Sequence, residues 1–184
     1  MKVNKNYYIN KIVVALTLIF ICGALTIIFN RDNVDVFLTG ERKLPIYSVD
    51  TNEKKIALTF DVSWGKDNTE KILDILDKYN VKATFFLIGA WMEDNTELVK
   101  EIHNRGHELA NHSTKHPDMT KISRDRIIKE VEITDSKIRE VVGGSSNIFR
   151  CPSGAYNDKV IETLKDINYY CIQWDVEGIN IKVK

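Results

Sequence analysis

ATFFLI, at Ala83–Ile88, is a short and almost wholly apolar run of the kind that forms a strand buried on both faces of a sheet. The run KIALTF at Lys55–Phe60 has the same character. Between the two, Asn68–Tyr79 places apolar residues at helical spacing, with Asp67 or Asn68 as its cap. A strand, a helix and a second strand in that order predict two parallel strands joined by a right-handed crossover.

The alternation of strands and helices continues along the chain. We expect helices over Thr96–Arg105, Ser123–Val142 and Asp158–Ile167, and strands over His107–Ala110, Asn147–Arg150 and Tyr169–Trp174. Gly106 and Gly143 follow the first two helices and would end them, and Asn157 would cap the third. Five strands separated by helices indicate an α/β fold with a parallel sheet.

The N-terminal part of the chain has a different character. Residues 12–29 form an uncharged, apolar run, which as a helix would be about 27 Å long and close to the thickness of a bilayer core. Lysines precede this run and acidic residues follow it, which predicts residues 1–11 in the cytoplasm and the rest outside the membrane. The alternative is a cleaved signal peptide, although such peptides have a shorter apolar core and a small-x-small exit. We therefore expect a single-pass cell-membrane protein with an anchor at 12–29, a linker at 30–53 and one domain at 54–184.

Composition excludes several classes of protein. The 184 residues include 26 basic and 26 acidic side chains, so the chain lacks the net positive charge of a nucleic-acid-binding protein. Its 43% hydrophobic content excludes general disorder. Three cysteines are too few for a disulfide framework, and Cys151 and Cys171 lack the Cys-x-x-Cys spacing of a redox site. The oligomeric state is left open.

Polar side chains follow the predicted strands at the points where the strands end. Asp61 follows the first strand, His112 and His116 follow the third, and Arg150 ends the fourth. In parallel α/β folds the chemistry lies beyond the carboxyl ends of the strands. We therefore expect these side chains to meet at one cavity mouth.

The histidine pair is a candidate metal site. Two histidines at i and i+4 can face one way on a helical turn and present their nitrogens to one ion, and Asp61 would add a carboxylate. The alternative is that His112 and His116 are surface or capping residues, and spacing alone leaves both possibilities open. His103 lies on a predicted helix and His107 begins a strand, so we predict that neither is a ligand.

Four motifs together resemble one family. They are TFD at Thr59–Asp61, GHE at Gly106–Glu108, HSTKH at His112–His116 and RCPSG at Arg150–Gly154. Their order and spacing resemble those of the NodB-homology polysaccharide deacetylases of carbohydrate esterase family 4, over about residues 54–180. The longer run TFDVSWG at 59–65 is similar to the membrane-anchored sporulation branch. The resemblance implies a distorted (β/α) barrel that hydrolyses N-acetyl groups of amino sugars in peptidoglycan or a related cell-wall glycan.

The resemblance also implies a role for each site residue. A divalent metal, zinc or a similar ion, would lower the pKa of a bound water toward about 7. Asp61 matches the general base and is the carboxylate that could also contact the metal, while His112 and His116 match metal ligands. Arg150 matches the residue that pairs with the base. The backbone N–H of Ser153 matches the donor to the tetrahedral oxyanion.

The sequence departs from the family at three places. Val62 stands where the family usually has a second Asp as third metal ligand, so either Asp61 itself contacts the metal or the two histidines bind it weakly. Asn180 and Ile181 align with an Asp-Trp pair of the family, and no histidine follows His116 to act as the late general acid. General acid help is worth about 10²–10⁴-fold. With five strands the barrel is expected to be incomplete, and the domain truncated.

Two functions therefore stay open. The first is a metal-dependent deacetylase with reduced activity. The second is a catalytically impaired, membrane-tethered protein that binds glycan or assists assembly. Acetate release from an N-acetylglucosamine oligomer distinguishes the two.

Overall fold

The computed structural model describes residues 13, 15–25, 42–65 and 68–177. The chain divides into two compact units, Met1–Arg42 and Lys43–Lys184. Residues 178–184 lie outside the described part, and with them the sequence comparison made at Asn180 and Ile181.

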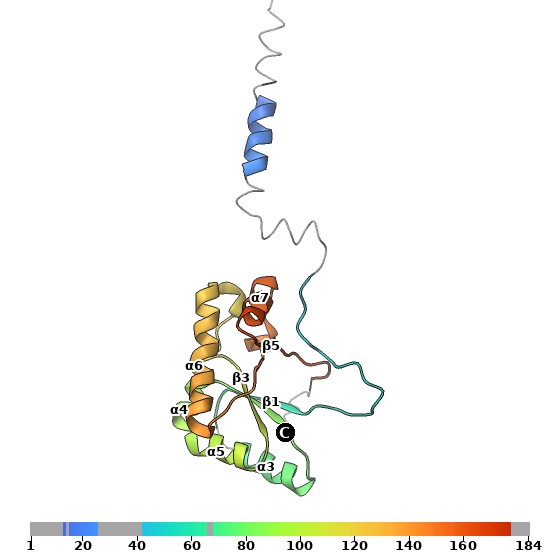
Figure 1. Cartoon of the computed structure of the whole chain (residues 1–184), viewed down its shortest axis with the longest axis vertical. Helices are drawn as coiled ribbons and strands as arrows, with labels where there is room; N and C mark the ends of the chain where they lie inside the picture. The colour runs from blue at the N-terminus through green and yellow to red at the C-terminus, as the bar shows by residue number, and fades with distance from the viewer. Residues whose placement is uncertain (1–12, 14, 26–41, 66–67, 178–184) are drawn as a thin grey trace, which may run out of the picture. The chain divides into compact units, whose positions relative to one another are not determined.

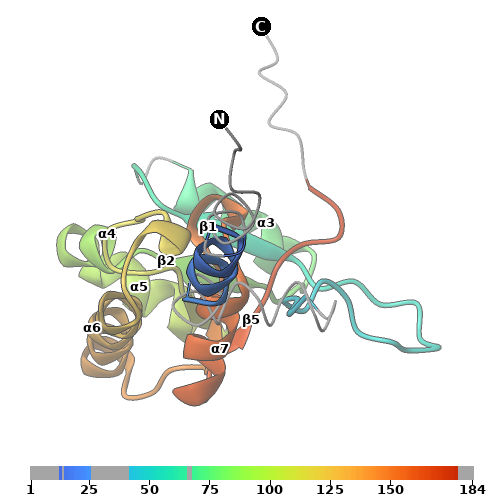
Figure 2. The same ribbon diagram turned by 90° about the horizontal axis from the view of Figure 1, so that it is seen from above.

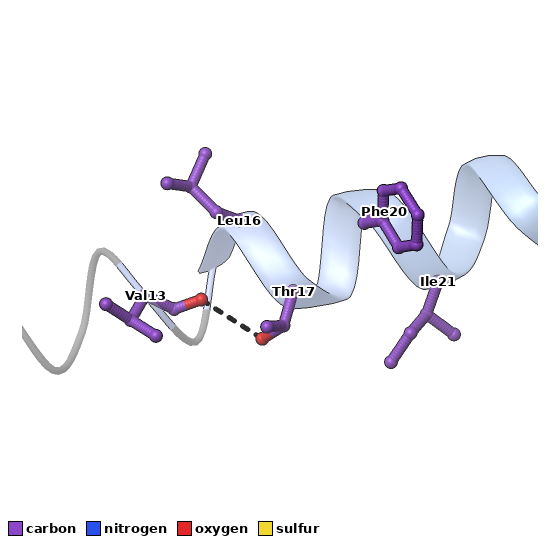
Figure 3. A pocket seen from close by; sticks show the side chains of 5 residues that line it. All are labelled: Val13, Leu16, Thr17, Phe20 and Ile21. Atoms are coloured by element: carbon purple, nitrogen blue, oxygen red, sulfur yellow. Dashed lines mark hydrogen bonds between the residues drawn. The ribbon is translucent and has the colours of Figure 1, made fainter.

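A helix over residues 15–25 is the main described element of the first unit. It exposes large apolar side chains, and Figure 3 shows five residues that line a shallow hollow on it, namely Val13, Leu16, Thr17, Phe20 and Ile21. Thr17 Oγ1 donates a hydrogen bond to the carbonyl of Val13 at 3.0 Å. Within the described residues no helix combines the length and the apolar character needed to cross a membrane. The predicted span at 12–29 lies partly outside those residues.

The second unit contains a sheet of five parallel strands in the order β1-β2-β3-β4-β5. The strands are β1 Thr59–Val62, β2 Thr84–Leu87, β3 Glu108–Asn111, β4 Ile148–Phe149 and β5 Tyr170–Cys171. This confirms the predicted α/β fold with a parallel sheet. β1 begins later than predicted and includes Asp61, which pairs in register with Phe86. The distorted (β/α) barrel goes beyond this sheet and stays a prediction.

Helices connect the strands and cover the sheet. They are α3 Thr69–Lys78, α4 Gly89–Asp94, α5 Thr96–Asn104, α6 Arg124–Val142 and α7 Asp158–Asp166, with short 3₁₀ turns η1 Met119–Lys121 and η2 Pro152–Gly154. α4, α5 and α6 lie together along one side of the strands in both views (Figures 1 and 2), and α6 also packs against α7. Ser123 caps α6 and Asn157 caps α7 through side-chain oxygens, whereas Asn68 precedes α3 without a side-chain capping bond.

Two groups of buried apolar side chains form the core. The first includes Phe85, Leu87 and Val99, from β2 and α5. The second includes Phe149 and Leu164, from β4 and α7. Both groups bury one apolar stripe of each helix against the sheet, which is how parallel α/β domains are stabilised.

A segment before β1 extends the sheet at the β5 edge. The amide of Ile46 donates to the carbonyl of Cys171 at 2.8 Å, and the amide of Gln173 donates to the carbonyl of Ile46 at 2.8 Å. Ile46 therefore forms a parallel bridge beside β5. This residue falls within the range 30–53 that the sequence predicted as a linker.

The start of α4 supports the loop that follows β3. The amides of Gly89 and Ala90 donate to the carbonyls of Ser113 and Thr114 at 3.0 and 2.9 Å. A Cβ atom on Gly89 would lie 2.6 Å from Oγ1 of Thr134 and 3.3 Å from Cα of Thr114. The close approach of α4, α6 and this loop therefore requires glycine at this position.

Replacing Gly89 by Ala is expected to lower the free energy of unfolding by about 1–3 kcal/mol, because the added methyl group overpacks the contact with α6. Urea denaturation of the purified variant measures the change. Gly144→Ala is the matched control, since a Cβ there meets nothing within 4 Å. Equal stability of the Gly89→Ala variant and the natural chain would contradict the close approach.

Candidate active site

An ion pair links the first and fourth strands at their carboxyl ends. Nη1 of Arg150 donates to Oδ1 of Asp61 at 2.7 Å and to Oγ1 of Thr59 at 3.0 Å. The Arg150 side chain is 4% exposed and that of Asp61 is 35% exposed. The cation is therefore buried while the carboxylate remains open to small molecules. This confirms that the two residues are adjacent.

The remaining contacts of Arg150 come from β2 and β5. Its Nε and Nη2 point to the carbonyls of Ile172 and Gln173, at 3.5 and 3.3 Å. The guanidinium carbon lies 4.0 Å from the ring centre of Phe86 and 5.7 Å from that of Trp174. A flat guanidinium suits this mixture of oxygen acceptors at its edge and aromatic rings at its faces.

His112 lies beside this pair and is oriented by it. Its Nδ1 is 2.9 Å from the carbonyl of Arg150, which can only accept a hydrogen bond, so Nδ1 carries the proton and Nε2 has a free lone pair in the neutral ring. Nε2 lies 3.9 Å from Oδ2 of Asp61, beyond direct hydrogen-bond range. Burial lowers the pKa of His112, and the charge of Asp61 opposes this shift. The ring is therefore neutral at pH 7. Below about pH 6.5 the unfolded chain takes up a proton on this ring more readily than the folded chain, so the free energy of unfolding decreases as the pH falls.

The second histidine of the motif lies next to the first. The ring centres of His112 and His116 are 5.1 Å apart, with the rings edge to face. The prediction that the two histidines share a helical turn is wrong, because Ser113 and His116 both have left-handed backbone angles, with φ of 67° and 56°. The loop closes through its own side chains instead, as Ser113 Oγ accepts from the His116 amide at 3.0 Å and Asn111 Oδ1 accepts from the Ser113 amide at 2.9 Å.

A buried carboxylate that the sequence analysis missed holds this loop. Glu130 of α6 accepts the amides of Thr114 and Lys115 on Oε2, both at 2.9 Å, and pairs with Arg126 through Oε1. Its side chain is 1% exposed. The signal in the sequence is a single acidic residue on the apolar face of α6, three positions after Ile127.

Ser153 lies in the turn that follows β4. The turn has left-handed angles at Ser153 and Gly154, with φ of 54° and 65°. Nε2 of Gln173 donates to the carbonyl of Gly154 at 3.2 Å, and a Cβ on Gly154 would meet the Trp174 ring at 3.0 Å. The segment that follows β5 therefore fixes the shape of this turn, and Ser153 itself is exposed. Its role as oxyanion donor stays a prediction.

The side chains present do not complete a metal site. Across residues 42–65 and 68–177, no group of three or more His, Cys, Asp or Glu residues is arranged to hold an ion. His112 and His116 offer imidazoles, but Asp61 is already engaged by Arg150 and Val62 is buried in the core. A catalytic zinc site normally has three protein ligands, so the donor set falls short. The metal assignments of His112, His116 and Asp61 stay predictions.

The other two histidines lie away from the pair. His107 is buried at the start of β3, where its Nδ1 accepts the amide of Ala83 at 3.2 Å. Burial lowers its pKa. His103 lies in α5, on an exposed position. That neither is a ligand stays a prediction.

Comparison with known proteins identifies the family of this site. The family model described as polysaccharide deacetylase matches residues 48–172, which is more than half of the chain. The chain belongs to the polysaccharide deacetylase family. Among curated relatives, it is 33% identical over 138 residues to the peptidoglycan-N-acetylmuramic acid deacetylase PdaA of Bacillus subtilis, covering 74% of this chain and 52% of PdaA. It is also 33% identical over 153 residues to a peptidoglycan-N-acetylglucosamine deacetylase of Bacillus cereus, covering 83% of this chain and 56% of that protein.

Solved structures of family members have the same fold. The structure of PdaA, a family 4 carbohydrate esterase, matches with a TM-score of 0.71 and 33% identity, over 76% of this chain and 60% of that one. BA3943 of Bacillus anthracis, a family 4 pseudoenzyme, matches with a TM-score of 0.69 and 37% identity, over 72% of this chain and 47% of that one. The polysaccharide deacetylase family thus includes both enzymes and a pseudoenzyme. The present chain spans about half the length of the curated relatives it matches.

Replacing Asp61 by Asn is expected to lower the pKa of His112 further. The carboxylate charge raises that pKa against the effect of burial, and the substitution removes the charge while keeping the shape. A pH titration of the His112 ring by NMR measures the shift, with His112→Gln used to assign its signal. Glu53→Gln, an exposed carboxylate elsewhere, is the control. A pKa that stayed the same or rose would contradict the proximity of ring and carboxylate.

Proposed function

We propose that this chain hydrolyses N-acetyl groups of amino sugars in peptidoglycan or a related cell-wall glycan. The observation that carries the proposal is the open carboxylate of Asp61, held by the buried guanidinium of Arg150 beside the neutral ring of His112. An amide resists attack by water, and a fixed base at the attacking water is the first requirement for its hydrolysis. The names of PdaA and the Bacillus cereus relative, both peptidoglycan deacetylases, support the substrate class.

Each side chain has a task in this proposal. Asp61 takes the proton of the attacking water through Oδ2, because Oδ1 is occupied by Arg150. As the C–N bond of the tetrahedral intermediate breaks, Asp61 returns this proton to the nitrogen of the leaving amine, and acetate is released. Arg150 holds the carboxylate in its orientation through the charge-assisted hydrogen bond of 2.7 Å. The amide of Ser153 stabilises the oxyanion of the tetrahedral intermediate. Deacetylases of this family are generally metal-dependent, and a bound divalent ion would supply a more acidic water. Because the metal-ligating side chains among the described residues are incomplete, no step above depends on a metal ion.

The test is acetate release from an N-acetylglucosamine tetramer and from isolated peptidoglycan. The natural chain is expected to release acetate, and Asp61→Ala to release none, because the substitution removes the proposed base. Glu53→Ala, at an exposed site, is expected to keep the rate of the natural chain. Equal acetate release by the natural chain and Asp61→Ala would contradict the assignment of the base.

A second candidate is a glycan-binding protein without catalysis. Three observations favour it. Val62 stands where the family usually has an Asp metal ligand, the metal-ligating side chains among the described residues are incomplete, and the chain is similar to the pseudoenzyme BA3943. Under this function the chain binds the same glycans and releases no acetate, whether or not zinc is added. The assay above therefore decides between the two candidates.

We also propose that residues 12–29 anchor the chain in the cell membrane, with the deacetylase domain outside the cytoplasm. Support comes from the uncharged sequence of this segment and from the exposure of Leu16 and Phe20 on the described helix. Among the described residues of the first unit, no apolar partner covers Leu16 or Phe20.

The longer resemblance at 59–65 to the sporulation branch favours a spore-related role.

Flotation of the full chain with lipid vesicles tests the anchor. The natural chain is expected to float with the vesicles, and a double variant Leu16→Asp/Phe20→Asp to remain in the dense fraction, since a charge at the bilayer centre costs about 2.5–3.5 kcal/mol. Ile56→Asp, which alters an exposed apolar residue of the second unit, is the matched control and should still float. Flotation of the double variant would overturn the proposed anchor.

A further inference from the structure

Trp64 is a large apolar side chain that the fold leaves in solvent. It follows β1 directly after Ser63 and is 81% exposed. The other two tryptophans are used inside the fold: Trp91 is buried in α4, and Trp174 packs against Arg150 and the turn at Gly154. A single exposed apolar side chain is common on protein surfaces, so the meaning of Trp64 depends on what lies beside it.

The backbone that carries Trp64 is held from both sides. Val62 before it is buried in the core. Gly65 after it has a left-handed backbone, with φ of 69°, and its carbonyl accepts the indole N–H of Trp91 at 2.6 Å. A buried side chain therefore fixes the loop at the residue next to Trp64, which presents the indole at a defined place.

That place is beside the candidate active site. The ring centre of Trp64 lies 6.3 Å from that of His116, which in turn contacts His112. Trp64 and Asp61 also line one open hollow of about 490 Å³, together with residues that include Ser63 and Phe85. This volume is within the range of small-ligand sites, which is about 300–1,000 Å³.

We propose that Trp64 is a binding platform for a pyranose ring of an N-acetylhexosamine oligomer. A pyranose has an apolar face of C–H groups, which packs on the electron-rich face of an indole, while its hydroxyl groups point to the polar edges around it. The neighbours of Trp64 suit this ligand, because Asp61, Ser63 and Asn68 line the same hollow with polar atoms. The inference rests on the proposed function for the identity of the sugar.

The polar surroundings favour a glycan over a protein partner. A stable protein interface buries about 1,200 Å² or more and has an apolar centre of several side chains. The hollow is also lined by apolar residues that are buried or half-buried, such as Phe60, Ile72 and Phe85. Trp64 is the exposed large apolar side chain among its lining residues, and the carboxylate of Asp61, the hydroxyl of Ser63 and the amide of Asn68 line the same hollow. One flat apolar surface with hydrogen-bonding groups at its edge matches one face of a sugar ring.

The test measures glycan binding and hydrolysis separately on the full chain. Calorimetry with chitotetraose gives the dissociation constant for the natural chain and for Trp64→Ala, Trp64→Phe and Tyr79→Ala. Tyr79 is the matched control, because it is an aromatic residue that is 67% exposed and follows α3. Trp64→Ala is expected to weaken binding about tenfold or more, Trp64→Phe to weaken it less, and Tyr79→Ala to leave it unchanged. Thermal melting of Trp64→Ala should match the natural chain, since the side chain is exposed.

The outcomes separate this inference from the proposed function. Weaker binding by Trp64→Ala with no acetate release by the natural chain supports the platform and rejects the deacetylase. Equal binding by Trp64→Ala and the natural chain overturns the platform even when acetate is released. A natural chain that does not bind chitotetraose at millimolar concentration overturns it too, as does an equal loss of affinity in Tyr79→Ala.

Discussion

The buried guanidinium of Arg150 is the constraint on which the rest of the site depends. A buried cation is costly unless its donors are satisfied and a counter-charge is near. Here Asp61 and Thr59 supply acceptors from β1, and the carbonyls of Ile172 and Gln173 supply acceptors from the β5 end. Because these acceptors come from separate strands, Arg150 can be satisfied only when the ends of β1, β4 and β5 lie in one arrangement. Folding of the sheet and assembly of the site are thus the same event.

The histidine loop shows a second use of a buried charge. Two residues of the loop have left-handed backbones, a conformation that is strained for side chains other than glycine. Glu130 compensates by accepting two loop amides, and the start of α4 donates two more hydrogen bonds to the carbonyls of Ser113 and Thr114. The loop is therefore held by α4 and α6 as well as by its own side chains. This explains how His112 and His116 meet without a helical turn between them.

The sequence was sufficient to predict the elements with strong periodicity and the adjacency of the polar residues that follow the strands. Helix α6 begins after Ser123 and ends before Gly143, as its capping residues predict. The adjacency of Asp61, His112 and Arg150 also follows from the rule that parallel strands bring their carboxyl ends together. The short helix α4 was missed because six residues contain too few turns for a periodic pattern. Contacts that depend on tertiary packing, such as that of Gln173 with Gly154, have no local pattern from which to predict them.

The balance between enzyme and binding protein depends on two acceptors that face each other. Nε2 of His112 and Oδ2 of Asp61 are 3.9 Å apart, and neither can donate a proton to the other while the ring is neutral and the carboxylate ionised. Two such acceptors favour a ligand that brings a donor or a positive charge to them. A water about to lose a proton meets this need, and so does the N–H of a bound acetamido group. The same pair of atoms therefore suits both proposed functions, hydrolysis and glycan recognition, and the second does not depend on the first. The effect expected of Val62 concerns only the first of these functions, so the open carboxylate and the exposed indole of Trp64 are compatible with either one.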